Sequence, residues 1–234
     1  MPEPTESAGG PPSTPRSASA PASAPGSVAV LVAELHERAR VRVLPGGAQP
    51  QEKDMGNVVD AEFGTLDIFF ANAGVAFGTP IETTDEAAYS RLMDVNVKGV
   101  FFSVQAVLPL MREGGSIVLN TSWLNQVGTP GRALLSASKA AVRSFARTLS
   151  AELLDRKIRV NAVSPGSIET PIHRGKEQSE ADFRAYTQRV GSQVPLQRMG
   201  RPEEIAAAVL FLASVGSSYM LGAEIVVDGG RAEL

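Results

Sequence analysis

Short apolar runs alternate with longer helical stretches from Gly64 to the end of the chain. The apolar runs, which have turn residues or charges nearby, are Leu66–Ala71, Ser116–Thr121, Ile158–Val163 and Glu224–Val227. Helical patterns lie between them at about 84–112, 137–155 and 202–214. Strands alternating with helices in this way are typical of a parallel sheet covered by helices on both faces. The pattern predicts an α/β fold.

The first quarter of the chain follows a different pattern. Residues 2–27 contain no Val, Ile, Leu, Met or aromatic residue, and such a Pro/Ala/Ser-rich composition cannot bury enough apolar surface to offset chain entropy. We therefore expect a disordered tail over 1–27 and a single domain over 28–234. Within that domain, Val28–Arg38 could form an amphipathic helix and Val41–Leu44 a short strand, whereas residues 48–60 are polar and ambiguous.

Composition and charge exclude several classes of function. The net charge of −3, without a basic stripe, gives no reason to expect nucleic acid. The chain has no cysteine and two histidines, so we expect no disulfide framework and no metal site. No apolar run reaches the roughly 18 residues of a membrane helix, and the N-terminus does not resemble a signal peptide. A cytoplasmic protein without a membrane partner is expected.

Two polar motifs interrupt the apolar pattern. Asn72-Ala73-Gly74 directly follows the first strand, and ligands bind beyond the carboxyl ends of strands in an open parallel sheet. A simple strand-to-loop turn is the more frequent explanation when this motif stands alone. Asn96 and Gly99 lie in the middle of a predicted helix, where both residues are unfavourable. They indicate a kink or a functional role, although an isolated Asn96 would more often be a satisfied polar residue.

Ser122 and Lys139 are the candidates for chemistry. Ser122 follows the strand Ser116–Thr121, where its hydroxyl can polarise a substrate oxygen or simply cap a helix or turn. Lys139 lies in a largely apolar helix, where burial is costly unless a partner is present. The hydroxyl groups of a dinucleotide ribose would be suitable partners. A lysine that extends to solvent remains the alternative.

A rigid loop follows the third strand. It contains Pro165, Gly166, Ile168 and Thr170, and the carboxyl end of its strand places it at the same edge of the sheet as the motifs above. Two further motifs are structural: Arg198–Ile205 begins a helix with a proline near its first position, and Val227–Gly230 ends the last strand.

From about Val58 to Gly230 these motifs together resemble the short-chain dehydrogenase/reductase family. Leu134–Ala141 is similar to the Y-x-x-x-K catalytic helix of that family, and Ser122 lies thirteen residues before position 135, as the family's catalytic serine does. The resemblance implies a doubly wound, Rossmann-like fold. It also implies an NAD- or NADP-dependent oxidoreductase that acts on a carbonyl or secondary alcohol of a small molecule.

The resemblance assigns a role to each motif. Ser122 would polarise the substrate oxygen, Lys139 would hold the nicotinamide ribose, and Asn96 would support a water that links the lysine to solvent. The cofactor would contact two loops, formed by Asn72, Ala73, Gly74, Pro165, Gly166, Ile168 and Thr170. Homodimers or homotetramers would assemble through the helices near 84–112 and 137–155.

Leu135 departs from the family pattern because it occupies the position of the catalytic tyrosine. Leucine has no proton to transfer, and loss of a positioned general acid typically costs about 10²–10⁴-fold in rate. Tyr186 and His173, in the segment 172–195 that would cover the substrate, are candidates for a replacement donor. We therefore include Leu135 among the catalytic positions.

The N-terminal part also departs from the family. The glycine-rich phosphate loop is not found, since Gly9-Gly10 and Gly46-Gly47 lack a third glycine and a strand-to-helix context. Only 27 residues separate Leu44 from Asn72, fewer than the family usually has. The sequence predicts an incomplete or divergent N-terminal part, and a replaced or frame-shifted start over 1–57 is a hypothesis.

Three functions are compatible with the sequence. The first is a working oxidoreductase on a carbonyl or secondary alcohol, with or without much reduced activity. The second is a catalytically inactive subunit that binds dinucleotide or serves as a scaffold. The third is a truncated, non-functional product. The choice between NAD and NADP stays open, and so does the substrate, which depends on the loops at 123–133 and 172–195. Trp123, Ile172 and Phe183 suggest only a partly apolar pocket.

Overall fold

The computed structural model describes residues 56–57, 59–61, 64–173 and 179–234. The predicted tail over 1–27, the predicted helix at Val28–Arg38 and the predicted strand at Val41–Leu44 lie outside the described residues. Gly9-Gly10 and Gly46-Gly47, the two glycine pairs that were compared with the glycine-rich phosphate loop, also lie outside them.

Four parallel strands form the sheet of the described chain. They are β1 (Leu66–Ala71), β2 (Met111–Asn120), β3 (Arg159–Pro165) and β4 (Glu224–Val227). The strands are hydrogen-bonded in the order β1-β2-β3-β4. All four predicted strands are present, and the predicted α/β, Rossmann-like fold with a parallel sheet is confirmed.

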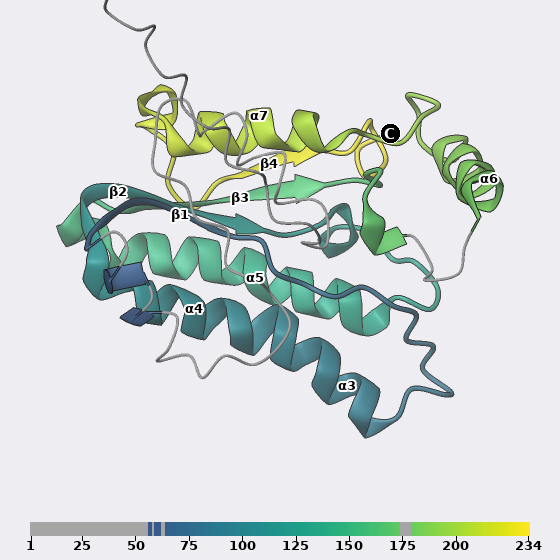
Figure 1. The fold of residues 1–234 in the computed structure, drawn as a ribbon, viewed down its shortest axis with the longest axis horizontal. Helices are drawn as coiled ribbons and strands as arrows, with labels where there is room; N and C mark the ends of the chain where they lie inside the picture. The colour runs from purple at the N-terminus through teal and green to yellow at the C-terminus, as the bar shows by residue number, and fades with distance from the viewer. Residues whose placement is uncertain (1–55, 58, 62–63, 174–178) are drawn as a thin grey trace, which may run out of the picture.

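Helices cover both faces of this sheet (Figure 1). One face carries α3 (Glu86–Met93), a π-helical segment (Asp94–Lys98), α4 (Gly99–Val107) and α5 (Ala133–Glu152). The opposite face carries α7 (Pro202–Ala213), and α6 (Glu180–Gly191) stands beyond the carboxyl ends of the strands. Short 3₁₀ segments lie at Leu108–Leu110, Trp123–Asn125, Leu154–Arg156, Pro171–His173 and Val215–Ser217.

The helix boundaries correct the sequence prediction in two places. The predicted helix at 84–112 ends in a 3₁₀ turn at Leu108–Leu110, and β2 already begins at Met111. Met111 pairs with Leu66 of β1, and Gly115 packs closely here, because a Cβ there would lie 2.8 Å from the Met111 side chain and 3.0 Å from the Asp67 carbonyl oxygen. The helix predicted at 137–155 instead spans Ala133–Glu152, so Leu135 lies within its first turn.

The buried side chains alternate between the two faces of the sheet. Ile117 and Leu119 of β2 belong to a core with α4 and α5, whereas Val118 between them packs toward α7. All three are fully buried, and burying such a side chain typically stabilises a fold by about 1.5–3 kcal/mol. Within the described part of the chain, no helix is long and apolar enough to cross a membrane.

Candidate active site

A cavity of about 720 Å³ lies at the carboxyl end of the sheet. The loops that follow β1, β2 and β3 line it, together with the first turns of α5 and one side of α6. Its volume is in the range typical of small-molecule and cofactor sites, and its place beyond the strand ends is where open α/β sheets bind ligands.

Most of the residues predicted for the site line this cavity. They are Asn72, Gly74, Ser122, Leu135, Lys139, Pro165, Gly166, Ile168 and Thr170. Ala73 does not line it, although both of its neighbours do. Asn96 is 1% exposed and lies behind the wall rather than in it. Residues from four separate stretches of the sequence thus meet at one place.

Lys139 projects from α5 toward the end of β2. Its Nζ donates a hydrogen bond to the carbonyl oxygen of Asn120 at 2.8 Å, and no carboxylate among the described residues forms an ion pair with it. Burial disfavours the ammonium form and lowers the pKa of Lys139 to about 8. The side chain is therefore a desolvated amine at the cavity wall, not a lysine extended to solvent.

Leu135 lies one helical turn before Lys139, on the same face of α5. It is 6% exposed and packs in a small apolar cluster with Leu92 and Leu124. Its side chain reaches the cavity wall but carries no group that can exchange a proton. The part of the cavity wall that Leu135 forms is consequently apolar.

Ser122 connects the end of β2 to the 3₁₀ segment Trp123–Asn125. Its Oγ accepts a hydrogen bond from the Leu124 backbone N–H at 3.3 Å, so it caps this segment. Capping uses the oxygen as an acceptor and leaves the hydroxyl proton to donate into the cavity. The structural and the chemical role of Ser122 are therefore compatible.

A glutamate that the sequence analysis did not single out supports the Ser122 loop. Glu224 starts β4, and its carboxylate accepts hydrogen bonds from Thr121 Oγ1 at 2.5 Å and from Asn125 Nδ2 at 2.8 Å. Arg143 Nε lies 3.4 Å from the same carboxylate. The only signal in the sequence was an acidic residue at the start of an otherwise apolar strand.

Asn96 lies in the π-helical segment between α3 and α4, where a helix irregularity was predicted. Its Oδ1 accepts a hydrogen bond from the Val75 N–H at 2.8 Å, and its Nδ2 donates to the Val75 carbonyl oxygen at 3.0 Å. The same Nδ2 donates to Ser138 Oγ at 3.3 Å. Asn96 thus fastens the loop after β1 to α5, next to Lys139.

Two glycines of the cavity wall pack closely against neighbouring residues. A Cβ on Gly166 would lie 2.5 Å from Asp228 Cα, so only glycine lets the loop after β3 pack against the end of β4. A Cβ on Gly74 would lie 3.3 Å from Asn96 Oδ1 and 3.8 Å from Lys139 Nζ. Both glycines also line the cavity, so at these two positions a ligand meets backbone without a side chain.

The wall formed by α6 and the C-terminal residues contains side chains with their own contacts. Tyr186 Oη lies 3.2 Å from His173 Nδ1. The guanidinium of Arg231 lies 4.3 Å from the centre of the Trp123 ring and donates to Gln193 Oε1 at 3.0 Å. Tyr186, His173 and Trp123 were noted from the sequence. The arginines of this wall were not, because no motif spacing marks them.

Comparison with known proteins gives one family and many relatives. The family model described as enoyl-(acyl carrier protein) reductase matches residues 24–232. An oxidoreductase of Sarocladium schorii is 42% identical over 178 residues, which are 75% of this chain and 70% of that protein. A 3-oxoacyl-[acyl-carrier-protein] reductase of Thermotoga maritima is 39% identical over 198 residues, 80% of this chain and 78% of that protein.

Solved structures show the same fold. The ligand-free aldohexose dehydrogenase of Thermoplasma acidophilum has a TM-score of 0.78 and 25% identity, over 89% of this chain and 90% of that one. A gluconate 5-dehydrogenase of Burkholderia cenocepacia in complex with NADP and tartrate has a TM-score of 0.69 and 28% identity. The structural match covers 80% of this chain and 72% of that one.

Proposed function

Because the chain belongs to the short-chain dehydrogenase/reductase family, we propose that it is an NAD- or NADP-dependent oxidoreductase. It interconverts a carbonyl and a secondary alcohol in the cavity described above. One observation carries the proposal: Ser122 and Lys139 line a single cavity together with the glycine-backed loops after β1 and β3. The absence of a tyrosine at position 135 predicts a slow enzyme.

The described half of the site fits the nicotinamide riboside part of the cofactor. Lys139 offers its amine to ribose hydroxyl groups, and the exposed backbone at Gly74 and Gly166 admits a flat ring. Thr170, which is 8% exposed, presents a hydroxyl at the same wall. Bound NAD(P)H supplies a hydride. The glycine-rich loop with which the family holds the phosphates was not found in the sequence, and the N-terminal part in which the family has it lies outside the described residues.

Ser122 and Lys139 then have different roles at the substrate oxygen. The Ser122 hydroxyl donates a hydrogen bond to that oxygen and stabilises the negative charge that develops on it. Leu135 cannot supply the proton, so the Lys139 ammonium supplies it, directly or through a water. Its pKa of about 8 is suitable, since a general acid works best when its pKa is near the operating pH.

Titration of the purified, folded chain with NADH and NADPH tests this proposal, followed by turnover with a panel of ketones and aldehydes. We expect saturable binding of one cofactor and slow turnover. Lys139→Met should weaken the binding and abolish turnover. Lys157→Met is the matched control, because Lys157 is exposed and pairs with Glu113 far from the cavity. Absence of binding in a folded sample would contradict the proposal.

A second candidate function is a subunit that binds dinucleotide without turnover. The apolar packing of Leu135 with Leu92 and Leu124 favours it, because an apolar side chain occupies the position at which the family has its proton donor. Cofactor binding without any turnover, unchanged by Leu135→Tyr, would select this candidate over the enzyme.

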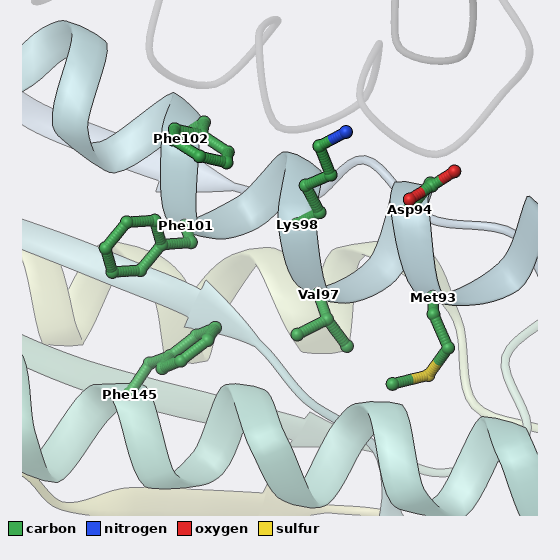
Figure 2. Close-up of a pocket in the computed structure, with 7 residues that line it drawn as sticks. All are labelled: Met93, Asp94, Val97, Lys98, Phe101, Phe102 and Phe145. Atoms are coloured by element: carbon green, nitrogen blue, oxygen red, sulfur yellow. The ribbon is translucent and has the colours of Figure 1, made fainter. Parts of the chain in front are cut away.

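We also propose that the chain forms a homo-oligomer through α4 and α5. A shallow groove of about 300 Å³ lies between these helices. Figure 2 shows Val97 and Phe101 directed toward α5, and Phe145 of α5 directed back toward them. Phe101 is 38% exposed, and its ring centre lies 5.7 Å from that of Phe145. A second copy of the same face would cover these rings.

A further inference from the structure

The charge of the cavity wall is one-sided. Three arginines, Arg132, Arg189 and Arg231, line the cavity together with Lys139. None of the described residues that line it is an aspartate or a glutamate. A concave, partly apolar site with positive charges of this kind raises the local concentration of anions.

His173, Tyr186 and Trp123 of the cavity wall each lie near one of the three arginines. Arg132 precedes α5 and is close enough to His173 that its charge, after burial, lowers the pKa of that histidine. The guanidinium of Arg189 lies 5.7 Å from the Tyr186 ring centre, and Tyr186 contacts His173. Arg231 packs on the Trp123 ring, with its guanidinium 4.3 Å from the ring centre.

Arg132 and Arg189 differ from other arginines of the molecule. Arg112, Arg143 and Arg198 each form an ion pair with a carboxylate. No carboxylate among the described residues pairs in this way with Arg132 or Arg189. Both guanidinium groups thus retain donors for a ligand, and the fork of such a group matches a carboxylate with two parallel hydrogen bonds.

Arg231 is less available. Its guanidinium already donates to Ser167 Oγ and to Gln193 Oε1, and the Asp228 carboxylate partly offsets its charge. We regard it as a fixed part of the wall that adds to the positive field. Arg132, which is half-buried, lies deeper than Arg189, which is exposed at the rim.

The position of these arginines separates them from the cofactor loops. Gly74, Pro165, Gly166 and Thr170 belong to loops after β1 and β3, whereas Arg132 and Arg189 belong to the start of α5 and to α6. The apolar surface between them, which includes Phe77, Leu135 and Ile172, would contact the carbon skeleton of a substrate.

We propose that the cavity binds an organic acid, a hydroxy acid or the corresponding oxo acid, whose carboxylate pairs with Arg132 and Arg189. This substrate class rests on the proposed oxidoreductase function, which places the reacting oxygen at Ser122. Arg132 is the main specificity-determining residue, and Arg189 holds the outer side of the carboxylate.

Binding of benzoate and hexanoate, compared with benzamide and hexanamide, tests the proposal by calorimetry on the full chain. The amides preserve shape and remove the charge. We expect each carboxylate to bind at least about tenfold more tightly than its amide, a difference of about 1.4 kcal/mol. Arg132→Met should remove this preference, and Arg189→Met should reduce it. Arg184→Met on the same helix does not touch the cavity and should leave it unchanged.

Amides that bind as well as carboxylates, or a preference that survives in the Arg132→Met and Arg189→Met double variant, would overturn the proposal. Circular dichroism and thermal unfolding establish that each variant is folded. The readout needs neither cofactor nor turnover. A chain that prefers carboxylates through Arg132 yet reduces no carbonyl therefore retains this subsite and refutes the oxidoreductase function. A chain that turns over neutral ketones and shows no carboxylate preference retains the oxidoreductase function and refutes the carboxylate subsite.

Discussion

Residue 135 determines how fast the proposed reaction can be. Leu135 lies one turn before Lys139 and lines the cavity, so Leu135→Tyr would place a phenol where the proton is needed. We expect turnover to rise by about 10²–10⁴-fold, the usual contribution of a positioned general acid. Steady-state rates with the best ketone of the panel provide the measurement.

Leu135→Phe is the matched control for that substitution, because it adds the ring without the hydroxyl. It should give no increase. A gain equal to that of Leu135→Tyr would show that cavity shape, and not proton transfer, limits the rate.

Lys139 predicts a pH dependence of the rate. Burial lowers its pKa to about 8, so the amine is charged below this pH and loses its proton above it. If the ammonium is the proton donor, the rate of carbonyl reduction should fall as pH rises through about 8. The pH profile of kcat measures this. Leu135→Tyr, which supplies a phenol, should alter the profile. A parent rate that does not change as pH rises through about 8 would exclude Lys139 as the donor.

The same pKa affects stability. A buried ammonium destabilises the folded state, and this penalty is fully present below pH 8. As pH rises from about 8 toward the unfolded value of about 10.4, the unfolded chain holds more protons, so stability increases. The urea midpoint of the protein relative to that of Lys139→Met should rise over this window. A constant or falling difference would contradict the burial of the charge.

At the scale of the element, the strands were more predictable than the helix ends. β1 and β4 have the predicted limits, because continuous apolar runs bounded by turns define buried strands. The helix limits depend on tertiary contacts. β2 begins at Met111, which pairs with Leu66 of β1, a residue far away in the sequence.

The site was predictable to the extent that its residues lie in motifs. Ser122 and Lys139 follow family spacing, and the polar residue Asn96 in mid-helix signalled the π-helical segment. Arg132 and Arg189 come together only through the placement of α6 beyond the strand ends. The sequence could not predict this placement, because no local pattern specifies where α6 packs.

The Ser122 loop depends on the start of β4. Glu224 accepts hydrogen bonds from Thr121 and Asn125 and pairs with Arg143, and both charged side chains are largely buried. Glu224→Ala would leave Arg143 and these donors without their partner, a change that typically costs about 3–5 kcal/mol. Chemical denaturation measures this loss.

Glu113→Ala is the control, since Glu113 and Lys157 form an exposed pair and such pairs contribute little. It should leave the denaturation midpoint unchanged. Equal effects of the two substitutions would contradict a structural role for the Glu224 network.

At the scale of the whole molecule, the groove between α4 and α5 predicts self-association. Phe101→Asp would place a charge on the face that a second copy covers, so the oligomer should dissociate to a monomer. Sedimentation velocity measures the change. Ile81→Asp is the control, because Ile81 is 87% exposed outside this groove and should leave the oligomer intact. A monomeric parent protein would refute the interface.

The central claim is that this chain transfers hydride at the cavity formed by Ser122 and Lys139. The most direct test is single-turnover transfer from NADH or NADPH that carries deuterium at the transferred position, with mass spectrometry of the alcohol products. This detects even a slow reaction. The claim predicts deuterium on the former carbonyl carbon with the parent protein and none with Lys139→Met. If no deuterium-labelled alcohol forms in a folded sample that binds cofactor, the claim is contradicted. The chain would then be a dinucleotide-binding subunit.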